Sequence, residues 1–409
     1  MLERNPSQII FPQFEDTVDK TEAPRYLITM DVGIGDAVAI GLSAVDQIIR
    51  NDPAAYGNID VLCNKLQAEI FTHDPRISSI IATDITFFPS LEPSSWLKTI
   101  FLDGERASIV HLLQQRHYKG VFPSIVAPGL YLGLHSHIML PNIFKLMKDL
   151  LIQHHPANVS SRTVARQMVN RAFGKKIPEA ALEEKEVLLY LSSQEIRKAR
   201  MTAAMIKEAY SRDTDSYPLV VAPDSASAVT RPPTQLLAPA LACALKQCPN
   251  LVICILPGYT DFTASENLRS SLAPYFDGRI FLLPAKPRAT LLETAAFLDQ
   301  ADILITGDTG VMHLAAATKQ LKPGENILFR PRNLVQIIAL FGGTNPAYYG
   351  YKKRAINLGA GRKEQLAFRP GFSKEAYNAH GRNLFDHIAP GEITEAIISS
   401  ILTKTKKTV

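Results

Sequence analysis

The sequence predicts an α/β protein made of two Rossmann-like domains that face a central cleft. The chain has 409 residues, too many for a single core of the usual size, so two domains are expected. Apolar runs of strand length alternate with helical patterns, which is typical of a parallel, doubly wound sheet. The alternation starts twice, near residue 25 and again near residue 217. We therefore assign the first domain to residues 1–216 and the second to residues 217–409.

The first domain opens with a strand, a glycine-rich turn and a helix. Strands are expected at residues 25–30, 59–63 and 77–82, and helices at residues 37–50 and 65–71. Residues 96–148 are less regular and rich in aromatic residues and histidine. Residues 160–216 carry Glu, Lys and Arg pairs at helical spacing, so we interpret them as a helical connector that ends this domain.

The second domain repeats the alternation of strands and helices. Strands are expected at residues 219–222, 251–256, 279–283, 301–306 and 336–341, and helices at residues 234–247, 290–299 and 392–402. No internal repeat or low-complexity tract interrupts the series.

The composition is that of an ordinary soluble globular protein, with 46% hydrophobic and 20% charged residues. The net charge of +5 is too small for this length to indicate nucleic-acid binding, while peripheral membrane contact through a local basic face stays open. The four cysteines form no Cys-x-x-Cys pair, so we expect core residues of a reduced compartment. No signal pattern and no apolar run of about 18 residues is found, which predicts a cytoplasmic protein.

The most informative stretch is residues 301–317, where a strand breaks at Gly307 and a helix starts near Met312. Between them lie Asp308, Thr309 and Gly310, and His313 follows one turn later. In α/β proteins the carboxyl end of a strand faces the ligand crevice, and a helix start offers free N–H groups. This stretch is predicted to hold a polar ligand, although a structural turn with a core histidine is the alternative.

Asp36 follows a Gly33-x-Gly35 turn after the first strand. A dinucleotide fingerprint is incomplete here, because the third glycine is missing, and a methyltransferase turn for S-adenosylmethionine or a purely structural turn are alternatives. A carboxylate at a helix start is kept ionised by the helix dipole, which suits a base that accepts a proton from a hydroxyl.

Two further groups of residues suggest ligand chemistry. Ser225 and Ser227 precede a helix, with Arg231 nearby, and would form a diphosphate cradle or simply a capped helix. The His135-x-His137 pair suggests a metal, but no carboxylate or cysteine set stands at ligand spacing, so no metal is predicted.

Taken in order, these segments resemble glycosyltransferase family 9, the heptosyltransferases of lipopolysaccharide core assembly. The Asp-Thr-Gly-x-x-His-Leu-Ala-Ala hallmark of the family corresponds to residues 308–316, and its Leu-(Phe/Tyr)-Gly-x-Thr-x-Pro motif to residues 340–346. Residues 289–293 resemble the (Thr/Ser)-Leu-x-Glu helix start, residues 223–233 the donor loop, and residues 35–36 the N-terminal Gly-Asp element.

The resemblance implies a GT-B fold, with an N-terminal acceptor domain and a C-terminal nucleotide-sugar domain, and an inverting reaction that needs no metal or other cofactor. It implies that Asp36 is the general base and that Asp308 holds sugar hydroxyls. The remaining implied donor contacts are Ser225, Ser227 and Arg231 near the diphosphate, Thr309, Gly310 and His313 at diphosphate and sugar, and Ala289 beside the nucleobase through its main chain.

The chain departs from the family pattern in three places. Arg231 stands where lysine is common, and it keeps the charge but changes the geometry. The acid that binds the ribose has no clear counterpart, with Asp261 and Glu266 as candidates. Residues 319–335 form a longer connection than usual, which we expect to border the donor site.

The sequence therefore predicts a glycosyltransferase (hexosyl or heptosyl transfer) that moves a sugar, with heptose from ADP-heptose as the favoured donor, to an acceptor hydroxyl. Its partners are a nucleotide-sugar donor and an acceptor that stays open: a glycan or lipid-linked sugar, a small molecule or a protein side chain. The alternatives are a GT-B protein that binds nucleotide sugars without transfer, and a methyltransferase that uses S-adenosylmethionine.

Overall fold

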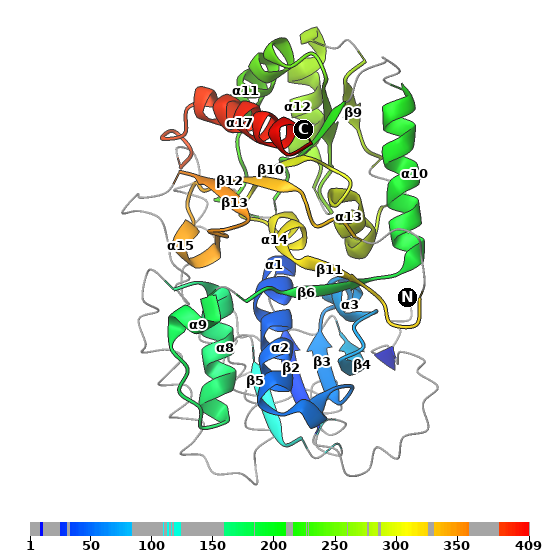
Figure 1. Cartoon of the computed structure of the whole chain (residues 1–409), viewed down its shortest axis with the longest axis vertical. Helices are drawn as coiled ribbons and strands as arrows, with labels where there is room; N and C mark the ends of the chain where they lie inside the picture. The colour runs from blue at the N-terminus through cyan, green and yellow to red at the C-terminus, as the bar shows by residue number, and fades with distance from the viewer. Residues whose placement is uncertain are drawn as a thin grey trace, which may run out of the picture. The chain divides into compact units, whose positions relative to one another are not determined.

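The computed structural model divides the chain into two compact units, Met1–Tyr190 and Leu191–Val409 (Figure 1). The described residues are 9–10, 25–30, 33–83, 109, 113, 116, 118–123, 159–183, 185–209, 216–225, 227, 229–259, 261–275, 278–284, 288–325, 331–359 and 384–408. The division falls before α10 (Ser193–Ala209), a helix that the sequence had assigned to the connector of the first domain. α10 instead packs against α13 (Leu291–Leu298), and so it belongs to the second unit.

The first unit is built on a five-stranded sheet in the order β1-β4-β3-β2-β5. β2, β3, β4 and β5 are parallel, and β1 is antiparallel to β4. Because β2 connects through β3 to β4 on one side and β5 lies on its other side, the topology reverses beside β2. The strands are β1 (Ile9–Ile10), β2 (Tyr26–Met30), β3 (Ile59–Cys63), β4 (Ile77–Ala82) and β5 (Gly120–Pro123).

The helices of the first unit include one irregular segment. α1 (Ile34–Asp36) continues through a π-helical stretch, Ala37–Gly41, into α2 (Leu42–Asn51). The other helical elements are a 3₁₀ turn (Pro53–Ala55), α3 (Lys65–Phe71), α8 (Ser161–Ala172) and α9 (Glu179–Glu183). The predicted strands β2, β3 and β4 and helix α3 are confirmed. The interpretation of residues 160–216 as helical throughout is wrong, because β6 (Leu188–Leu191) interrupts it. Four apolar residues between two charged helical stretches are too short a signal to identify a strand.

The second unit contains a six-stranded parallel sheet in the order β13-β12-β10-β7-β8-β9. Apolar runs fill its central strands, as expected where helices cover both faces. Its core includes residues from β7, β8, β10 and β12 together with α11, α12 and α17. The strands are β7 (Tyr217–Ala222), β8 (Leu251–Ile255), β9 (Ile280–Leu282), β10 (Ile303–Gly307), β12 (Gln336–Leu340) and β13 (Ala355–Leu358).

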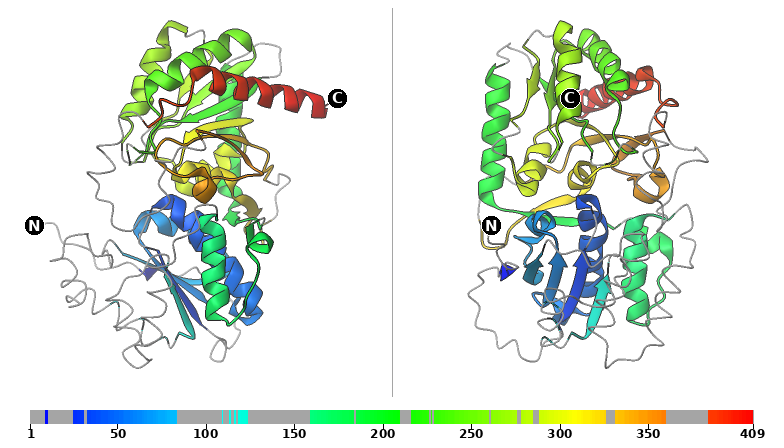
Figure 2. Two further views of the ribbon diagram at one scale, coloured as in Figure 1. Left: turned by 90° about the vertical axis from the view of Figure 1, so that its left-hand side faces the viewer. Right: turned by 180° about the vertical axis from the view of Figure 1, so that it is seen from behind.

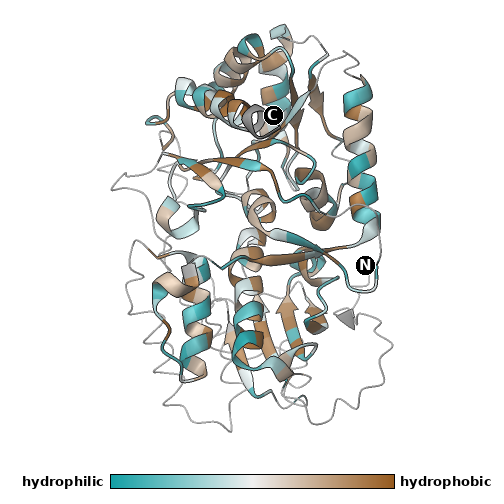
Figure 3. Cartoon of the chain, viewed as in Figure 1, coloured by the Kyte–Doolittle hydropathy of each residue, from teal (hydrophilic) through white to brown (hydrophobic). Residues whose placement is uncertain are grey.

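Two groups of helices cover this second sheet (Figure 2). α13 contacts α10 and α14, while α11 contacts α12 and α17. The strands carry the hydrophobic colours in Figure 3, whereas α8 and α10 display many hydrophilic residues. The further bounds are α11 (Thr234–Gln247), α12 (Thr263–Leu272), a 3₁₀ turn (Ala273–Tyr275), α14 (Gly310–Ala316), β11 (Thr318–Leu321), α15 (Pro346–Tyr349) and α17 (Pro390–Thr408).

The described residues 331–335 of the long connection lie at the amino edge of this sheet, whereas Asp308 follows the carboxyl end of β10, and the expectation that the connection borders the donor site stays a prediction. The backbone N–H of Asn333 donates to Asp299 Oδ1 over 2.6 Å, and the N–H of Gln336 donates to the carbonyl of Asp302, just before β10, over 2.9 Å. α14 runs back from the carboxyl edge, and the described part of the connection therefore starts on the opposite side from Asp308.

The cysteines are all free, as the sequence indicates, but they are not all core residues. Cys63 and Cys254 are buried, and Cys243 is exposed on α11. Within the described ranges, no helix has the length and apolar character needed to cross a membrane.

Candidate functional site

The second sheet has its topological switch between β7 and β10. From β7 the chain moves outward through β8 and β9, and then returns to β10 and moves the other way through β12 and β13. Thr306 near the end of β10 pairs with Ala222 at the end of β7, so the segments that follow both strands leave the sheet side by side. Ligands of doubly wound proteins bind at such a carboxyl edge. The structure thus brings the predicted residues after β7 and after β10 together.

The loop after β7 packs between the turns that follow β10 and β12. A Cβ atom added to Gly307 would lie 1.9 Å from the carbonyl oxygen of Thr230, and one added to Gly343 would lie 2.2 Å from Val229 Cγ1. The N–H of Gly343 also donates to the carbonyl of Val229 over 3.2 Å. Glycine at residues 307 and 343 is therefore what lets three predicted motifs meet.

We expect Gly307→Ala to lower the free energy of unfolding by about 3 kcal/mol, because the added methyl group would clash with a backbone oxygen. Unlike a side-chain atom, this oxygen cannot move away by a change of rotamer. Chemical denaturation measures this change. Gly391→Ala is the matched control, since an added Cβ there meets nothing within 4 Å, and it should be neutral or slightly stabilising. Equal effects of the two substitutions would contradict the close packing at Gly307.

The hydroxyls of Ser225 and Ser227 shape this loop. Ser225 Oγ lies 2.6 Å from Thr230 Oγ1 and accepts from the N–H of Ser227 over 3.3 Å. Ser227 Oγ accepts from the N–H of Val229 over 3.3 Å. Both predicted residues thus lie at the expected edge, and their side chains hold the loop in shape for its neighbours.

Arg231 supplies a half-buried cation at the same edge. Its Nε donates to the carbonyl of Ser225 over 3.0 Å, and its Nη2 donates to Asp261 Oδ2 over 3.0 Å. Asp261 Oδ1 in turn accepts from the N–H of Thr263 over 3.0 Å. The bonds from Thr263, and after them the Arg231 guanidinium, hold the pKa of Asp261 below its usual range. Of the two candidate ribose acids, Asp261 thus lies against Arg231, while Glu266 is exposed on α12.

Asp224 is a structural carboxylate that the sequence did not identify. It is buried and accepts from the N–H groups of Gly258 and Ala264, each over 3.0 Å, and from the Ser265 hydroxyl. It fastens the segments after β7 and β8 to one another. A Pro-Asp-Ser sequence is typical of an ordinary turn, so no sequence signal pointed to this role.

Asp308, His313 and Tyr351 form a connected group. His313 Nε2 lies 3.5 Å from Asp308 Oδ1, and His313 Nδ1 lies 2.9 Å from Tyr351 Oη. His313 is only 4% exposed, so its imidazole faces these two partners rather than bulk solvent. Thr309 is the N-cap of α14, and its Oγ1 lies 3.1 Å from Thr306 Oγ1. α14 starts at Gly310, and the N–H groups of Met312 and His313 donate to the carbonyl of Thr309 over 3.1 and 3.4 Å.

Burial lowers the pKa of His313, but the oxygens of Tyr351 and Asp308 outweigh it and raise the pKa to about 9. The imidazole is thus protonated at neutral pH and paired with Asp308. The positive charge of the His313 imidazole can balance the negative charge of a group that lies close to it.

The raised pKa predicts a pH-dependent contribution to stability. It should be fully present below the unfolded pKa of about 6.5, amount to about 3 kcal/mol there, and be lost as the pH rises through about 9. Buried Lys319, whose pKa burial lowers to about 7, acts in the opposite direction. The contribution of His313 is therefore measured as the difference in unfolding free energy between wild type and His313→Gln across this pH range. A difference that does not shrink towards alkaline pH would contradict it.

Ala289 lies two residues before α13, next to the N-cap residue Thr290, in the connection that follows β9. Thr290 and Glu293 form a capping box, with each backbone N–H donating to the other side chain over 3.0 Å, as the (Thr/Ser)-Leu-x-Glu pattern indicates. The guanidinium of Arg288 lies 4.9 Å above the ring of Tyr259, and Tyr259 Oη donates to Thr294 Oγ1 over 2.7 Å. The segments after β8 and β9 are therefore joined beside Ala289.

Asp36 occupies the corresponding edge of the first unit. It is the third residue of a helical run that starts after β2, where the topology of that sheet reverses. It is half-buried, and its Oδ2 lies 3.7 Å from where a Cβ of Gly33 would be. The π-helical stretch begins at the next residue, and such irregularities are frequent at functional sites. Asp31 and Val32 of the predicted glycine-rich turn lie outside the described residues.

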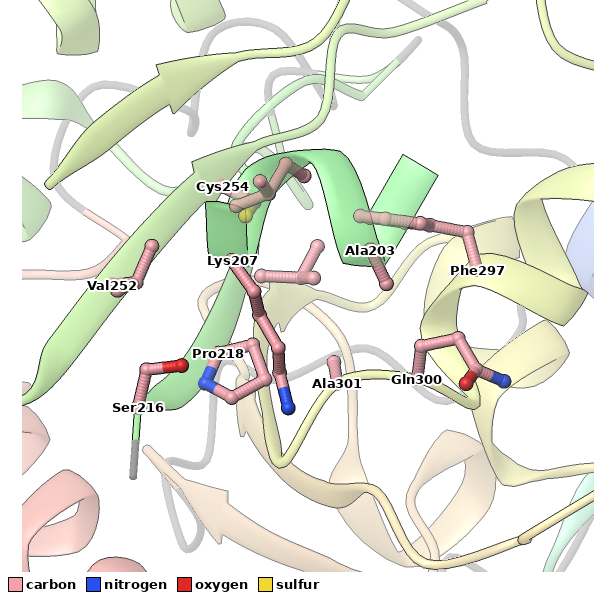
Figure 4. Close-up of a pocket in the computed structure, with 11 residues that line it drawn as sticks. Ala203, Lys207, Ser216, Pro218, Val252, Cys254, Phe297, Gln300 and Ala301 are labelled. Atoms are coloured by element: carbon pink, nitrogen blue, oxygen red, sulfur yellow. The ribbon is translucent and has the colours of Figure 1, made fainter. Parts of the chain in front are cut away.

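No group of three or more His, Cys, Asp or Glu side chains that could hold a metal occurs in the part of the chain that the structure describes. His135 and His137 lie outside it. A cavity of about 20 Å³ lies between α10, α13 and strands β7 and β8, lined by mostly apolar side chains (Figure 4). It has room for about one water molecule and lies away from the carboxyl edge, so it is not the ligand site.

These features define the class of the protein. Two α/β units whose sheets are largely parallel, each carrying polar groups at the switch point of its own sheet, are the GT-B fold. The chain is similar to *E. coli* ADP-heptose lipopolysaccharide heptosyltransferase II, with a TM-score of 0.60 and 13% identity over 93% of this chain and 99% of that one. It is similar to a glycosyltransferase family 9 protein from Veillonella parvula (TM-score 0.59, 13% identity, 93% and 97% covered). It is also similar to *E. coli* heptosyltransferase WaaC with ADP-2-deoxy-2-fluoro heptose (0.50, 15%, 92% and 99%).

Residues 264–377 of the chain match the model of glycosyltransferase family 9 (heptosyltransferase). The predicted resemblance is confirmed over that segment, which contains Ala289, Asp308, Thr309, Gly310 and His313. Asp36, Ser225, Ser227 and Arg231 lie outside it, where the similarity is one of fold. No curated protein sequence matches the chain. Together these findings support a glycosyltransferase.

Proposed function

We propose that the protein is an inverting, metal-independent glycosyltransferase that moves heptose from ADP-heptose to an acceptor hydroxyl. The observation that carries the proposal is the Asp308–His313 pair, which lies beside the Arg231 loop at the switch point of the second sheet. Both residues lie in the segment that matches the heptosyltransferase family. The identity of the donor rests on that match and on the neighbours, whose names include ADP-heptose and an ADP-heptose analogue.

On the donor side, the second unit would bind the activated sugar. Arg231 and the N–H groups of Thr309 and Gly310 would face the diphosphate, and the protonated His313 would add positive charge close by. Asp308 would accept hydrogen bonds from sugar hydroxyls, and Ala289 would lie beside the nucleobase. Fixed positive groups of this kind stabilise the charge that develops on a leaving diphosphate.

On the acceptor side, Asp36 would act as the general base. The acceptor oxygen forms a bond to the anomeric carbon while the bond from that carbon to the diphosphate oxygen breaks. The electron pair leaves with ADP, and the acceptor proton passes to the Asp36 carboxylate. A single displacement of this kind inverts the anomeric configuration and requires no covalent intermediate.

Release of ADP from ADP-heptose, followed with and without a chelator, tests the proposal. The acceptors to be compared are a lipid-linked core sugar of lipopolysaccharide, a small-molecule glycoside and a peptide. We expect ADP release that depends on one acceptor, persists in EDTA and gives a product of inverted configuration by NMR. Loss of activity in EDTA, restored by an added metal, would contradict metal independence.

A second candidate function is binding of nucleotide sugars without transfer. It is favoured by Arg231, which replaces the usual lysine and is engaged by Asp261 and Ser225. Tight binding of ADP-heptose with no ADP release for any acceptor would establish this alternative.

The sequence context also leads us to propose that the reaction takes place in the cytoplasm and serves lipopolysaccharide biosynthesis.

A further inference from the structure

Tyr351 contacts the imidazole of His313 although it belongs to none of the motifs that the sequence analysis identified. It lies two residues after α15 and is 8% exposed. Its ring meets that of His313 edge to face, with centroids 5.6 Å apart, in addition to the contact of 2.9 Å between Oη and Nδ1. Within the described residues, Tyr351 and Asp308 are the titratable groups that act on His313.

A hydroxyl is a suitable partner for a histidine that changes its protonation state, because it both donates and accepts hydrogen bonds. When His313 is protonated, Nδ1–H donates to Tyr351 Oη and Nε2–H points to Asp308. When His313 is neutral, Tyr351 Oη–H can donate to Nδ1, and this leaves the proton on Nε2. The bond made by one ring nitrogen sets the proton on the other, so Nε2–H faces Asp308 in both states.

We propose that Tyr351 is a positioning residue that fixes the tautomer and orientation of His313, and through it the Asp308 carboxylate that would hold the donor sugar. This inference rests on the proposed function for its last link, from Asp308 to the sugar. Its first link, from Tyr351 to His313, is a property of the folded chain alone. The two links are tested separately.

The first link is tested by ¹⁵N NMR of the histidine rings in the full chain from pH 6 to pH 10, with His313→Gln used to assign the signal. In the wild type the neutral ring should carry its proton on Nε2. In Tyr351→Phe, which keeps the ring packing, the Nδ1–H form should become populated and the titration midpoint should fall by about one pH unit. A wild-type ring protonated on Nδ1 when neutral, or a variant identical to the wild type, would overturn the inference.

Tyr348→Phe is the matched control, because Tyr348 is a second buried tyrosine three residues earlier, packed against Tyr349. It should leave the His313 titration unchanged. If Tyr351→Phe does not fold, a neutral wild-type ring that carries its proton on Nδ1 still overturns the first link.

The second link is tested by donor turnover in Tyr351→Phe. We expect kcat to fall about tenfold and its pH profile to shift with the His313 titration, with KM changed less. An unchanged pH profile in a variant whose His313 titration has moved would overturn the positioning role. If the wild type neither binds ADP nor transfers sugar, the proposed function fails, while the NMR result still decides the contact between Tyr351 and His313.

Discussion

Asp36→Asn lowers turnover of the donor by about 10²–10⁴-fold and leaves ADP affinity unchanged, if the carboxylate is the general base of the transfer. The reason is that an amide keeps the size of the side chain but cannot accept the acceptor proton. Steady-state ADP release and calorimetric titration with ADP measure the two quantities on the same preparation.

Glu208→Gln provides the control for this result, since it removes a carboxylate from the exposed end of α10. It should retain full turnover. Asp36→Glu should recover little activity, because the longer side chain displaces the carboxylate at the start of α1. Near-normal turnover in Asp36→Asn would show that another group, or water, takes the proton.

Asp308→Ala has the second largest expected effect, on stability and on sugar recognition together. The side chains of Asp308 and His313 are 7% and 5% exposed, so removal of the carboxylate leaves a buried imidazolium without its counter-charge. Breaking a buried pair of this kind costs about 3 kcal/mol. The variant should also bind ADP-heptose no more tightly than ADP. Denaturation and calorimetry measure the two effects.

Asp308→Asn separates the effect on stability from the effect on sugar recognition. Its amide carries no charge but still accepts the bond from His313 Nε2, so this variant should lose less stability than Asp308→Ala at pH 7. A wild-type stability in Asp308→Ala would contradict the pairing of Asp308 with a charged histidine.

Much of the second unit could be predicted from the sequence because its strands are continuous apolar runs that end in turn residues. The run at residues 303–307 and the polar residues after it made both the strand and the edge recognisable. The helix start near Thr290 was predicted from a local pattern of four residues, and Thr290 and Glu293 form a capping box there.

The contacts that hold the site together could not be predicted, because they join residues far apart in the chain. The pairs are Tyr351 with His313, Arg231 with Asp261, and Asp224 with the segment after β8. Tyr351, Asp261 and Asp224 do not belong to any recognisable spacing pattern. A single tyrosine or aspartate in a turn does not indicate which distant residue it contacts. The π-helical stretch after Asp36 was missed for a related reason, because its residues have an ordinary helical composition.

The most direct test of the central claim is the thermal stability of the protein with a panel of ligands, because a ligand that binds the folded state raises its apparent stability. The panel contains ADP, ADP-heptose, uridine and thymidine diphosphate sugars, and S-adenosylmethionine. We expect stabilisation by ADP and a larger effect of ADP-heptose, with the additional effect of the sugar absent in Asp308→Asn. Stabilisation by uridine or thymidine sugars alone would contradict the donor, and stabilisation by S-adenosylmethionine alone would contradict glycosyl transfer itself.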